Sequence, residues 1–561
     1  MIRRWTRDPL FWILLVAAAL RITGLFWGLP GADGWDNDGF APRNFLTALA
    51  LTWKPGSYFT YPPLHALILA LPSLPVAGWA LAHAPSLHQH DVIATITQPG
   101  YMTYFSVVAR LVSVAMSLGI IYCIGRMAKL VAGGHAGLFA SAAAALCVGL
   151  TYYGQVSNLD VPFLFWASLS MLAVMRAVTQ HKTRHFWRCA LFAACAVATK
   201  DQAYAVFALS LPALLVVWFA ADRWPRQNAR AVGVTLVLAG LAALFAVLLV
   251  DGAITNPSGF LKRIAFLTGP ASQDYVEYVR GPAGWWALLN DMARYFMRGT
   301  GFLAVMLALG GVVLHALRPR DGRWAAGWLP LLAMVSFTLC FNFVALRSDD
   351  RFLLPQAIFA CVYVGIAAER LAFGWPDWRA MAGRVALAVV ALMAVHQCMA
   401  VNAAMLFDPR YEAQAWLAAN VQPGDTIEVY DRNWLLPHLP ARAHVVRRGQ
   451  GDVKLRNPLP GVTEVQGQFR TARAPRFIVA SGWMMRRFLR AETSPRPGHV
   501  WSPLEQADFR NADARAFFDA LGAGQLPYHV AYVARPRASW WPALHMHDSL
   551  NETIGVYGRG P

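Results

Sequence analysis

Charged side chains are scarce in this sequence. Asp, Glu, Lys and Arg make up 14% of its 561 residues, hydrophobic residues make up 57%, and the mean hydropathy is +0.39. A soluble domain carries about 25% charged residues. The shortage therefore excludes a soluble multidomain enzyme, a disordered chain and a fibrous repeat, and it predicts a polytopic α-helical membrane protein.

Several cofactor and metal motifs are also absent. The sequence has no glycine-rich phosphate loop, no Cys/His zinc spacing and no dinucleotide fingerprint, so nothing supports ATP or a nucleotide-sugar as a substrate. Residues 402–561 contain none of the seven cysteines, which excludes a disulfide framework there. The isoelectric point near 9.9 is explained by basic cytoplasmic loops, as in other membrane proteins, and we expect no nucleic-acid partner.

Long apolar segments end at residue 401. We predict a transmembrane domain over 1–401 and a C-terminal soluble α/β domain over 402–561, which is large enough for its own core. The first apolar segment lacks a small-residue cleavage site and is expected to remain as an uncleaved span. The eleven apolar segments are 9–29, 101–124, 135–153, 161–178, 186–199, 203–221, 229–250, 299–317, 327–346, 352–369 and 381–401. The elements expected in the soluble domain are a helix at 411–419 and strands at 426–430, 476–480 and 553–557.

Basic residues orient these segments. Three arginines among the first seven residues place the N-terminus in the cytoplasm. A further apolar stretch, 62–82, contains Pro72 and Pro75 and keeps only about ten uninterrupted residues, whereas a span needs about 20. If this stretch does not cross the membrane, the five later loops that face the cytoplasm are all basic, as the positive-inside rule requires. If it crosses, these five basic loops face outward and the rule fails for each of them. We therefore interpret 62–82 as a juxtamembrane helix within a first outer loop, 30–100.

This topology collects polar groups on one side of the membrane. It places the C-terminal domain and the polar ends of several spans on the outer face of the membrane. The polar groups on that face are the loop 30–61, the turn Asn158–Asp160, Lys200–Asp201 and the segment Arg347–Arg351. Their convergence is what an active site at the bilayer surface needs.

The first outer loop is rich in aspartate. Asp33, Asp36 and Asp38 lie within six residues, and two carboxylates near an apolar boundary can have pKa values pushed apart, so that one acts as a general base. An Asp-rich loop also offers oxygen ligands to a divalent cation, which Asp36, Asp38 and Asp160 would hold, and we expect no other cofactor. A solvated turn is the simpler interpretation, because Gly and Asp favour turns.

Further candidates lie at the ends of later spans. A carboxylate at a span boundary, such as Asp160, is costly unless it is used or paired, although it also suits a helix cap. Lys200 offers a point charge to a lipid phosphate, or else snorkels to the interface. Arg347 and Arg351 suit a phosphate through their bidentate fork, or else pair with the aspartates between them.

Two ring-bearing residues flank the start of the juxtamembrane helix. Tyr61 precedes Pro62 and Pro63, and His65 follows them, at the point where proline is tolerated in the first helical turn. Both are candidates for substrate binding. The alternatives are a membrane anchor for Tyr61 and a structural role for His65.

In their order along the chain, these motifs resemble the GT-C superfamily of polyprenyl-phosphate-sugar glycosyltransferases. Within it they are similar to glycosyltransferase family 39, which includes protein O-mannosyltransferases and the lipid A aminoarabinose transferase. The matching elements are Asp36-Asn37-Asp38, Tyr61-Pro62-Pro63-Leu64, Asn158-Leu159-Asp160-Val161-Pro162, Thr199-Lys200, Arg351-Phe352-Leu353-Leu354-Pro355 and Tyr411–Leu417. The family usually has Asp-Glu in the first loop, and the aminoarabinose enzymes have Lys where this chain has Tyr61. A lipid A substrate is therefore not implied.

The resemblance implies a GT-C-like membrane domain and an inverting sugar transfer. The donor would be a polyprenyl-phosphate sugar, the acceptor a hydroxyl of an envelope glycan, lipid or protein, and the surrounding membrane lipids would be further partners. Asp36 or Asp38 would be the base, Lys200 and Arg351 would hold the departing phosphate, and Asp160 would orient a substrate. The rival functions are a transporter or flippase of lipid-linked sugars and a non-catalytic envelope scaffold.

Overall fold

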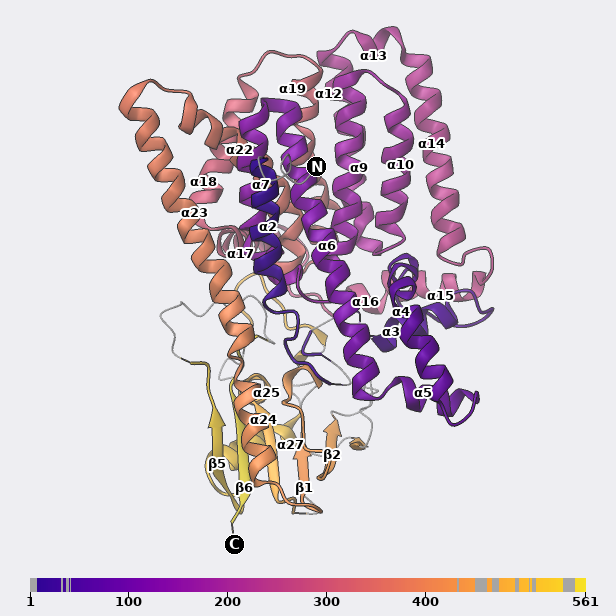
Figure 1. Ribbon diagram of the computed structural model, residues 1–561, viewed down its shortest axis with the longest axis vertical. Coiled ribbons are helices and arrows are strands. Elements are labelled where there is room, and N and C mark those ends of the chain that lie inside the picture. Colours follow the sequence, from indigo (N-terminus) through magenta and orange to yellow (C-terminus); the bar gives the residue numbers. More distant parts are fainter. Residues whose placement is uncertain are drawn as a thin grey trace.

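The computed structural model describes most of the chain. The described residues are 8–31, 34–36, 40, 42–430, 433–449, 462–466, 474–489, 494–503, 505–506, 511–537 and 550–560. A bundle of helices forms the larger part, and the sheet of the C-terminal domain lies beyond one end of the bundle (Figure 1). The predicted class, a polytopic helical membrane protein with a C-terminal α/β domain, is confirmed.

The predicted apolar segments are all helical. The first helices are α2 (Pro9–Ile22), α3 (Pro42–Leu51), α4 (Leu64–His83), α5 (Gln89–Ile96), α6 (Pro99–Ala132), α7 (Gly134–Ala145), α8 (Val148–Tyr153), α9 (Asp160–Gln180) and α10 (Arg184–Val197). The next are η1 (Asp201–Ala203), α11 (Tyr204–Phe207), α12 (Ser210–Ala221), α13 (Trp224–Gln227), α14 (Ala229–Val250), α15 (Pro257–Thr268), α16 (Pro270–Gln273), α17 (Pro282–Thr300) and α18 (Phe302–Ala316). The last of the bundle are α19 (Gly322–Gly327), α20 (Leu329–Phe337), η2 (Thr338–Asn342), α21 (Phe343–Ala345), η3 (Asp350–Leu353), α22 (Leu354–Phe373) and α23 (Asp377–Leu406).

Eight helical stretches of the described chain are long and apolar enough to cross a membrane. Seven of them coincide with segments expected from the sequence, and the eighth is α4. A bent pair, α17 and α18, brings the number to nine if it counts as one span. The expected segments 9–29, 135–153 and 186–199 form helices of fewer than 18 residues, so the number of eleven spans stays a prediction.

Helix α4 differs from the expectation in one respect. The sequence suggested that Pro72 and Pro75 limit it to about ten residues, but the helix continues through both prolines from Leu64 to His83. Its neighbours can absorb the lost hydrogen bonds, as in other membrane helices. It lies with α3, α5 and α15 near the end of the bundle that faces the C-terminal domain (Figure 1). A juxtamembrane position for α4 therefore stays our interpretation.

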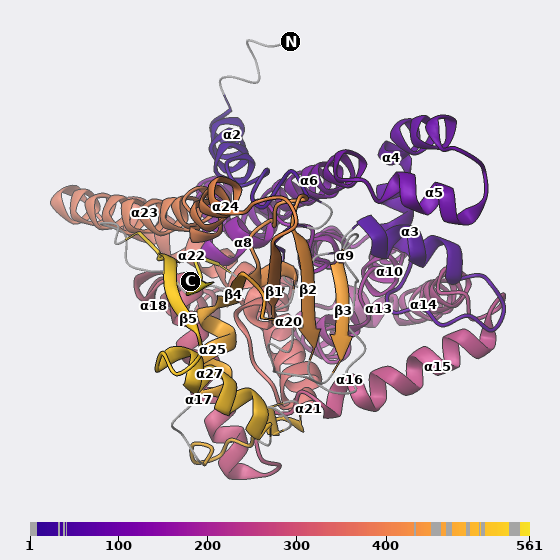
Figure 2. The same cartoon turned by 90° about the horizontal axis from the view of Figure 1, so that it is seen from below.

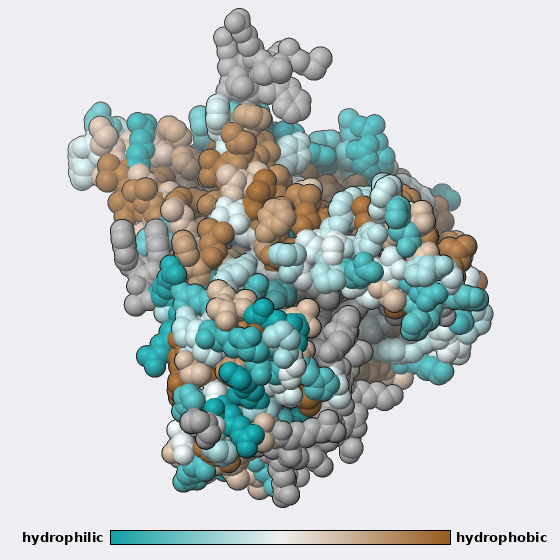
Figure 3. Space-filling model, turned by 60° about the horizontal axis from the view of Figure 1, so that its bottom comes forward, coloured by the Kyte–Doolittle hydropathy of each residue, from teal (hydrophilic) through white to brown (hydrophobic). Residues whose placement is uncertain are grey.

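The centre of the bundle is tightly packed around α6, α7 and α22. A Cβ atom on Gly125 of α6 would lie 2.9 Å from the carbonyl oxygen of Gly137 on α7, and one on Gly365 of α22 would lie 2.4 Å from the carbonyl oxygen of Ala136. Small residues let the helices approach this closely. Apolar side chains remain exposed around the outside of the bundle, whereas the C-terminal domain is largely hydrophilic (Figure 3).

The C-terminal domain is a three-layer α/β sandwich. Its elements are α24 (Pro409–Asn420), β1 (Thr426–Val429), η4 (Asn433–Leu435), β2 (His444–Gly449), β3 (Val462–Gln466), β4 (Phe477–Ser481), α25 (Gly482–Phe488), α27 (Ala512–Gly522), β5 (Tyr528–Ala534) and β6 (Ile554–Arg559). The strand order is β3-β2-β1-β4-β6-β5, with the first four strands parallel and the last two pairings antiparallel. The expected helix and three strands correspond to α24, β1, β4 and β6.

The two faces of this sheet are covered by different helices. Ala413 and Leu417 of α24 pack on one face, and Phe488 of α25 with Phe517 and Phe518 of α27 pack on the other (Figure 2). The strand order reverses between β1 and β4, so the carboxyl ends of these two strands form a topological switch point, where open α/β folds place functional loops.

Candidate active site

The turn between α8 and α9 joins several of the candidate residues. At its centre, the backbone N–H and the hydroxyl of Ser157 donate to Asp36 Oδ2 at 2.9 and 2.8 Å. The carbonyl oxygen of Ser157 accepts from the N–H of Phe40 at 2.7 Å. Three residues later the turn ends at Asp160, the first residue of α9. The acidic loop and the Asp160 region are thus held together by one short segment.

Asp36 is buried and fully engaged. Its second carboxylate oxygen accepts from Arg110 of α6 at 2.6 Å, and the side chains of Arg110 and Asp36 are 1% and 7% exposed. The other terminal nitrogen of Arg110 donates to the carbonyl oxygens of Leu25 and Trp27. Arg110 therefore fixes both the chain leaving α2 and the carboxylate at the end of that chain. Asp38, the second acid predicted as a base, lies outside the described residues, as does Asp33.

Asp160 and Lys200 form the second polar centre. Asp160 Oδ1 accepts from Lys200 Nζ at 2.6 Å and from Gln202 Nε2 at 3.0 Å, while Oδ2 has no hydrogen-bond partner although it is buried. Because Asp160 lies in the first turn of α9, the helix dipole also favours its negative charge. Of the two roles open for Asp160, pairing and capping, the structure shows pairing.

Tyr61 and His65 lie beside these centres. Their rings contact the ring of Phe40, with centroids 5.8 and 6.1 Å from it, and Phe40 is bonded to Ser157. The N–H of Leu64 donates to the carbonyl oxygen of Ala198 at 3.1 Å, next to Lys200. His65 is 1% exposed and its Nδ1 has no partner. Asp36, Tyr61, His65, Asp160 and Lys200 thus belong to one connected cluster.

Arg347 and Arg351 lie on the segment before α22. The Arg347 guanidinium stacks over the rings of Tyr275 and Phe352, at 4.9 and 4.7 Å from their centroids. Arg351 lies 4.6 Å from the centroid of Phe352 and 3.5 Å from Asp349 Oδ2. The first turn of this segment, η3, packs against α8. Arg351, which is part of η3, therefore lies near α8, the helix that precedes the turn with Ser157.

Of the three acids expected to hold a divalent cation, Asp36 and Asp160 are described and Asp38 is not. Asp36 and Asp160 each already face a cationic side chain, Arg110 or Lys200, at 2.6 Å. Within the described part of the chain, no three His, Cys, Asp or Glu side chains gather as ligands. A cation site at these acids stays a prediction.

Three partners in this site were not identified from the sequence. Arg110 lies inside an apolar helix, where an intramembrane charge could have drawn attention to it. Ser157 and Gln202 carry no signal beyond their closeness to Asp160 and Lys200. Glu277, on the loop between α16 and α17, lies near Arg347. Burial raises the pKa of Glu277 to about 7, and nearby Arg347 opposes that rise.

A buried network lies next to Lys200. Arg263 of α15 is fully buried, bonds to Asp201, and lies 3.5 Å from Asp251 Oδ2. Asp251 Oδ1 has no hydrogen-bond partner. Burial raises the pKa of Asp251 to about 7, although Arg263 opposes this. The network joins α14, α15 and η1 at the edge of the candidate site.

Asp251→Asn should stabilise the protein in a pH-dependent way. The folded protein favours the neutral carboxyl, so the unfolded carboxyl, with its ordinary pKa of 3.8, releases its proton earlier. Stability is therefore lost as the pH rises from about 4 to 7, and the full penalty applies above pH 7. We expect the apparent Tm in detergent to rise by about 2–4 °C at pH 8 and by clearly less at pH 5. An equal gain at both pH values would contradict this.

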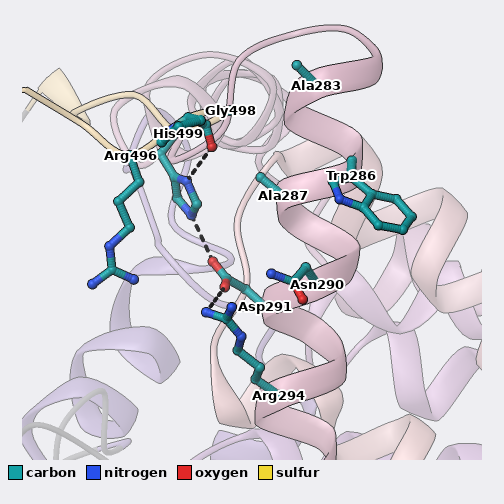
Figure 4. A pocket seen from close by; sticks show the side chains of 10 residues that line it. Ala283, Trp286, Ala287, Asn290, Asp291, Arg294, Arg496, Gly498 and His499 are labelled. Atoms are coloured by element: carbon teal, nitrogen blue, oxygen red, sulfur yellow. Dashed lines mark hydrogen bonds and ion pairs between the residues drawn. The ribbon is translucent and has the colours of Figure 1, made fainter.

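A cavity of about 330 Å³ lies between α17 and the segment 496–499 (Figure 4). His499 Nε2 donates to Asp291 Oδ2 at 2.8 Å, and the hydroxyl of Tyr278 donates to the same oxygen at 3.1 Å. The cavity shares no lining residue with the cluster around Asp36 and Asp160. Its wall attaches the C-terminal domain to the bundle and does not form the candidate site.

Known proteins similar to this chain are found among the solved structures. No protein-family profile and no curated protein sequence matches the chain. Its structure is similar to that of ArnT from Cupriavidus metallidurans bound to undecaprenyl phosphate, with 14% identity, a TM-score of 0.49 and coverage of 97% of this chain and 98% of that one.

Two further solved structures are also similar. The oligosaccharyltransferase of Archaeoglobus fulgidus, in complex with zinc and sulfate, has 11% identity, a TM-score of 0.44 and coverage of 94% and 79%. The mycobacterial arabinofuranosyltransferase AftD has 12% identity and a TM-score of 0.39, and the match covers 98% of this chain but 41% of AftD.

Proposed function

We propose that this protein is a membrane glycosyltransferase that moves a sugar from a polyprenyl-phosphate donor to an acceptor hydroxyl on the periplasmic face. The observation that carries the proposal is the connected cluster of Asp36, Asp160 and Lys200, which joins carboxylates and a cation at one end of the bundle. A transporter needs such charges along a path near the bilayer midplane, and a scaffold does not need them at all.

In the proposed reaction, the acceptor oxygen attacks the anomeric carbon opposite the lipid phosphate, so the configuration inverts. The new C–O bond forms as the bond to the phosphate oxygen breaks, the phosphate leaves with the electron pair, and a carboxylate takes the hydroxyl proton. Because a phosphate is already a weak base, no strong general acid is needed, unlike in glycoside hydrolases. The base is Asp36 or Asp38.

Cationic side chains would hold the phosphate. Lys200 and Arg351 are the main candidates, with Arg347 beside them, since guanidinium and ammonium groups bind phosphate oxygens through charge-assisted hydrogen bonds. Asp160 orients Lys200. Tyr61 and His65 line the approach to it from the start of α4. The test is transfer from a panel of polyprenyl-phosphate sugars by purified protein, with release of lipid phosphate as a second readout. Donor import into vesicles without transfer would favour the transporter.

Glu277 should make donor binding depend on pH. Its carboxyl, with a pKa of about 7, is neutral at pH 6 and ionised at pH 8, where it compensates the charge of Arg347 and weakens its attraction for a phosphate. Asp349 and Glu505 also face Glu277 and raise its pKa. We expect the donor KM to rise on the order of threefold between pH 6 and pH 8.

Glu277→Gln should keep the low KM at both pH values. The matched control is Asp274→Asn, an acid of the same loop that does not contribute to the pKa of Glu277. A pH dependence that persists unchanged in Glu277→Gln would assign it to another group.

A further inference from the structure

We infer that the C-terminal domain is part of the transfer machinery, because its side chains pack around Trp35 and thereby set the position of Asp36. This inference rests on the proposed function and deepens it. Trp35 directly precedes Asp36 and is 1% exposed. The ring of Trp35 contacts Trp27 on the membrane side and three side chains of the C-terminal domain.

Three C-terminal side chains surround the indole of Trp35. The Arg410 guanidinium lies 4.1 Å from its ring centroid. The ring of Tyr411 lies 4.7 Å away, and that of His438 is stacked at 5.5 Å with an interplanar angle of 24°. A desolvated cation–π contact of this kind contributes more than an exposed one. We call Arg410, Tyr411 and His438 the Trp35 clamp.

The clamp is itself held rigidly. Arg410 forms a bidentate ion pair with Asp408, at 2.8 and 2.6 Å, and both side chains are fully buried. Asp408 also accepts from the indole N–H of Trp27 at 3.1 Å, and Arg410 donates to the carbonyl oxygen of Trp434. Because both charges are buried and paired, removing either one is costly. The guanidinium therefore has one available position over Trp35.

The same domain binds the backbone of the loop before Trp35. The N–H of Gly28 donates to Tyr411 Oη at 2.9 Å, and His438 Nε2 donates to the carbonyl oxygen of Gly28 at 2.9 Å. A Cβ on Gly31 would lie 2.2 Å from the ring of His438, so the loop passes directly against it. Trp434 and His438 follow β1, at the topological switch point of the sheet.

The loop is thus held from two sides. Arg110 of α6 binds it through Leu25, Trp27 and Asp36 on the membrane side, and the clamp binds it on the side of the C-terminal domain. Asp36 is the next residue after Trp35, so rotation of the indole out of the clamp would carry the carboxylate away from Ser157. Misplacement of a reacting group by about 1 Å can cost on the order of 100-fold in rate. Trp35, Arg410 and His438 are therefore positioning residues.

The test compares Trp35→Ala, Trp35→Phe and His438→Ala with Trp416→Ala as a matched control. Trp416 lies on α24, stacks on Tyr532 at 5.7 Å and contacts the sheet, so its removal probes the same domain away from the loop. We expect Trp35→Ala to lower kcat about 100-fold, with a donor KM within about twofold of the wild type, because the phosphate ligands lie on other segments. Trp35→Phe should recover most of the rate, and Trp416→Ala should keep it.

Hydrogen exchange gives a readout that does not depend on transfer. The amides of Gly28 and Ser157 donate to Tyr411 and Asp36, and both should exchange faster in Trp35→Ala and His438→Ala but not in Trp416→Ala. If Trp35→Ala also exposes the amides of β4 and β6, the C-terminal domain has unfolded in that variant. The result for His438→Ala then decides whether the Trp35 clamp positions Asp36. Unchanged Ser157 protection, or faster exchange with unchanged kcat, would overturn the inference. Absence of transfer by the wild type from every donor would instead overturn the proposed function, while the exchange result still judges the clamp.

Discussion

Asp160→Asn and Lys200→Met should each reduce the rate of sugar transfer on the order of 100-fold or more. The double variant should be no slower than the slower of the two single variants. The two side chains are joined by a 2.6 Å hydrogen bond and are 1% and 15% exposed. Breaking one side of such a pair leaves the other charge uncompensated, which costs about 3–5 kcal/mol. Two residues that act as one unit are non-additive, which a double-mutant cycle measures.

The kinetic pattern separates the two roles. Lys200→Met should raise the donor KM, because it removes a phosphate ligand. Asp160→Asn should raise KM and also lower kcat, because the ammonium group of Lys200 is then no longer held in position. Asp222→Asn is the matched control, since Asp222 forms a 2.6 Å pair with His181. These residues follow α12 and α9, and α12 and α13 meet at the end of the bundle away from the C-terminal domain (Figure 1). Normal kcat and KM in Asp160→Asn would mean that the pair of Asp160 and Lys200 has only a structural role.

The sequence could predict that the residues of the candidate site lie on one face of the membrane. Span positions and loop charges predicted that the acidic loop, the Asp160 turn and Lys200 share one face, and their contacts through Ser157, Phe40 and Ala198 agree with that expectation. Hydropathy and the distribution of arginine are properties of long windows. These properties can be read without knowing any single contact, so this part of the prediction needed no coordinates.

The partners of the acids could not be predicted in the same way. Arg110 and Asp36 are 74 residues apart, and Trp35 and Arg410 are separated by almost the whole membrane domain. Such pairs depend on how the helices pack, and no local pattern encodes that. The helix through Pro72 and Pro75 escaped prediction for a related reason, since neighbouring segments decide whether a proline ends a membrane helix.

Asp36→Asn should also reduce transfer at least on the order of 100-fold, whichever acid is the base. The Asn side chain can still accept from Ser157, but it removes the charge opposite Arg110, whose side chain is 1% exposed. Arg110 would then be buried without a counter-charge, which displaces the loop. The comparison with Arg110→Lys, which keeps the charge but not the fork that reaches Leu25 and Trp27, shows how much of the loss is positional.

Asp38→Asn distinguishes a base at Asp36 from a base at Asp38. If Asp36 takes the proton, Asp38→Asn should stay within about tenfold of the wild-type kcat. If Asp38 takes the proton, Asp38→Asn should have a much lower kcat with an unchanged donor KM. Asp36→Asn would then lower kcat only because the loop is displaced, and replacing Arg110 as well should restore part of kcat. Full transfer in both Asp36→Asn and Asp38→Asn would remove the aspartate base, and the inverting mechanism would then need another proton acceptor.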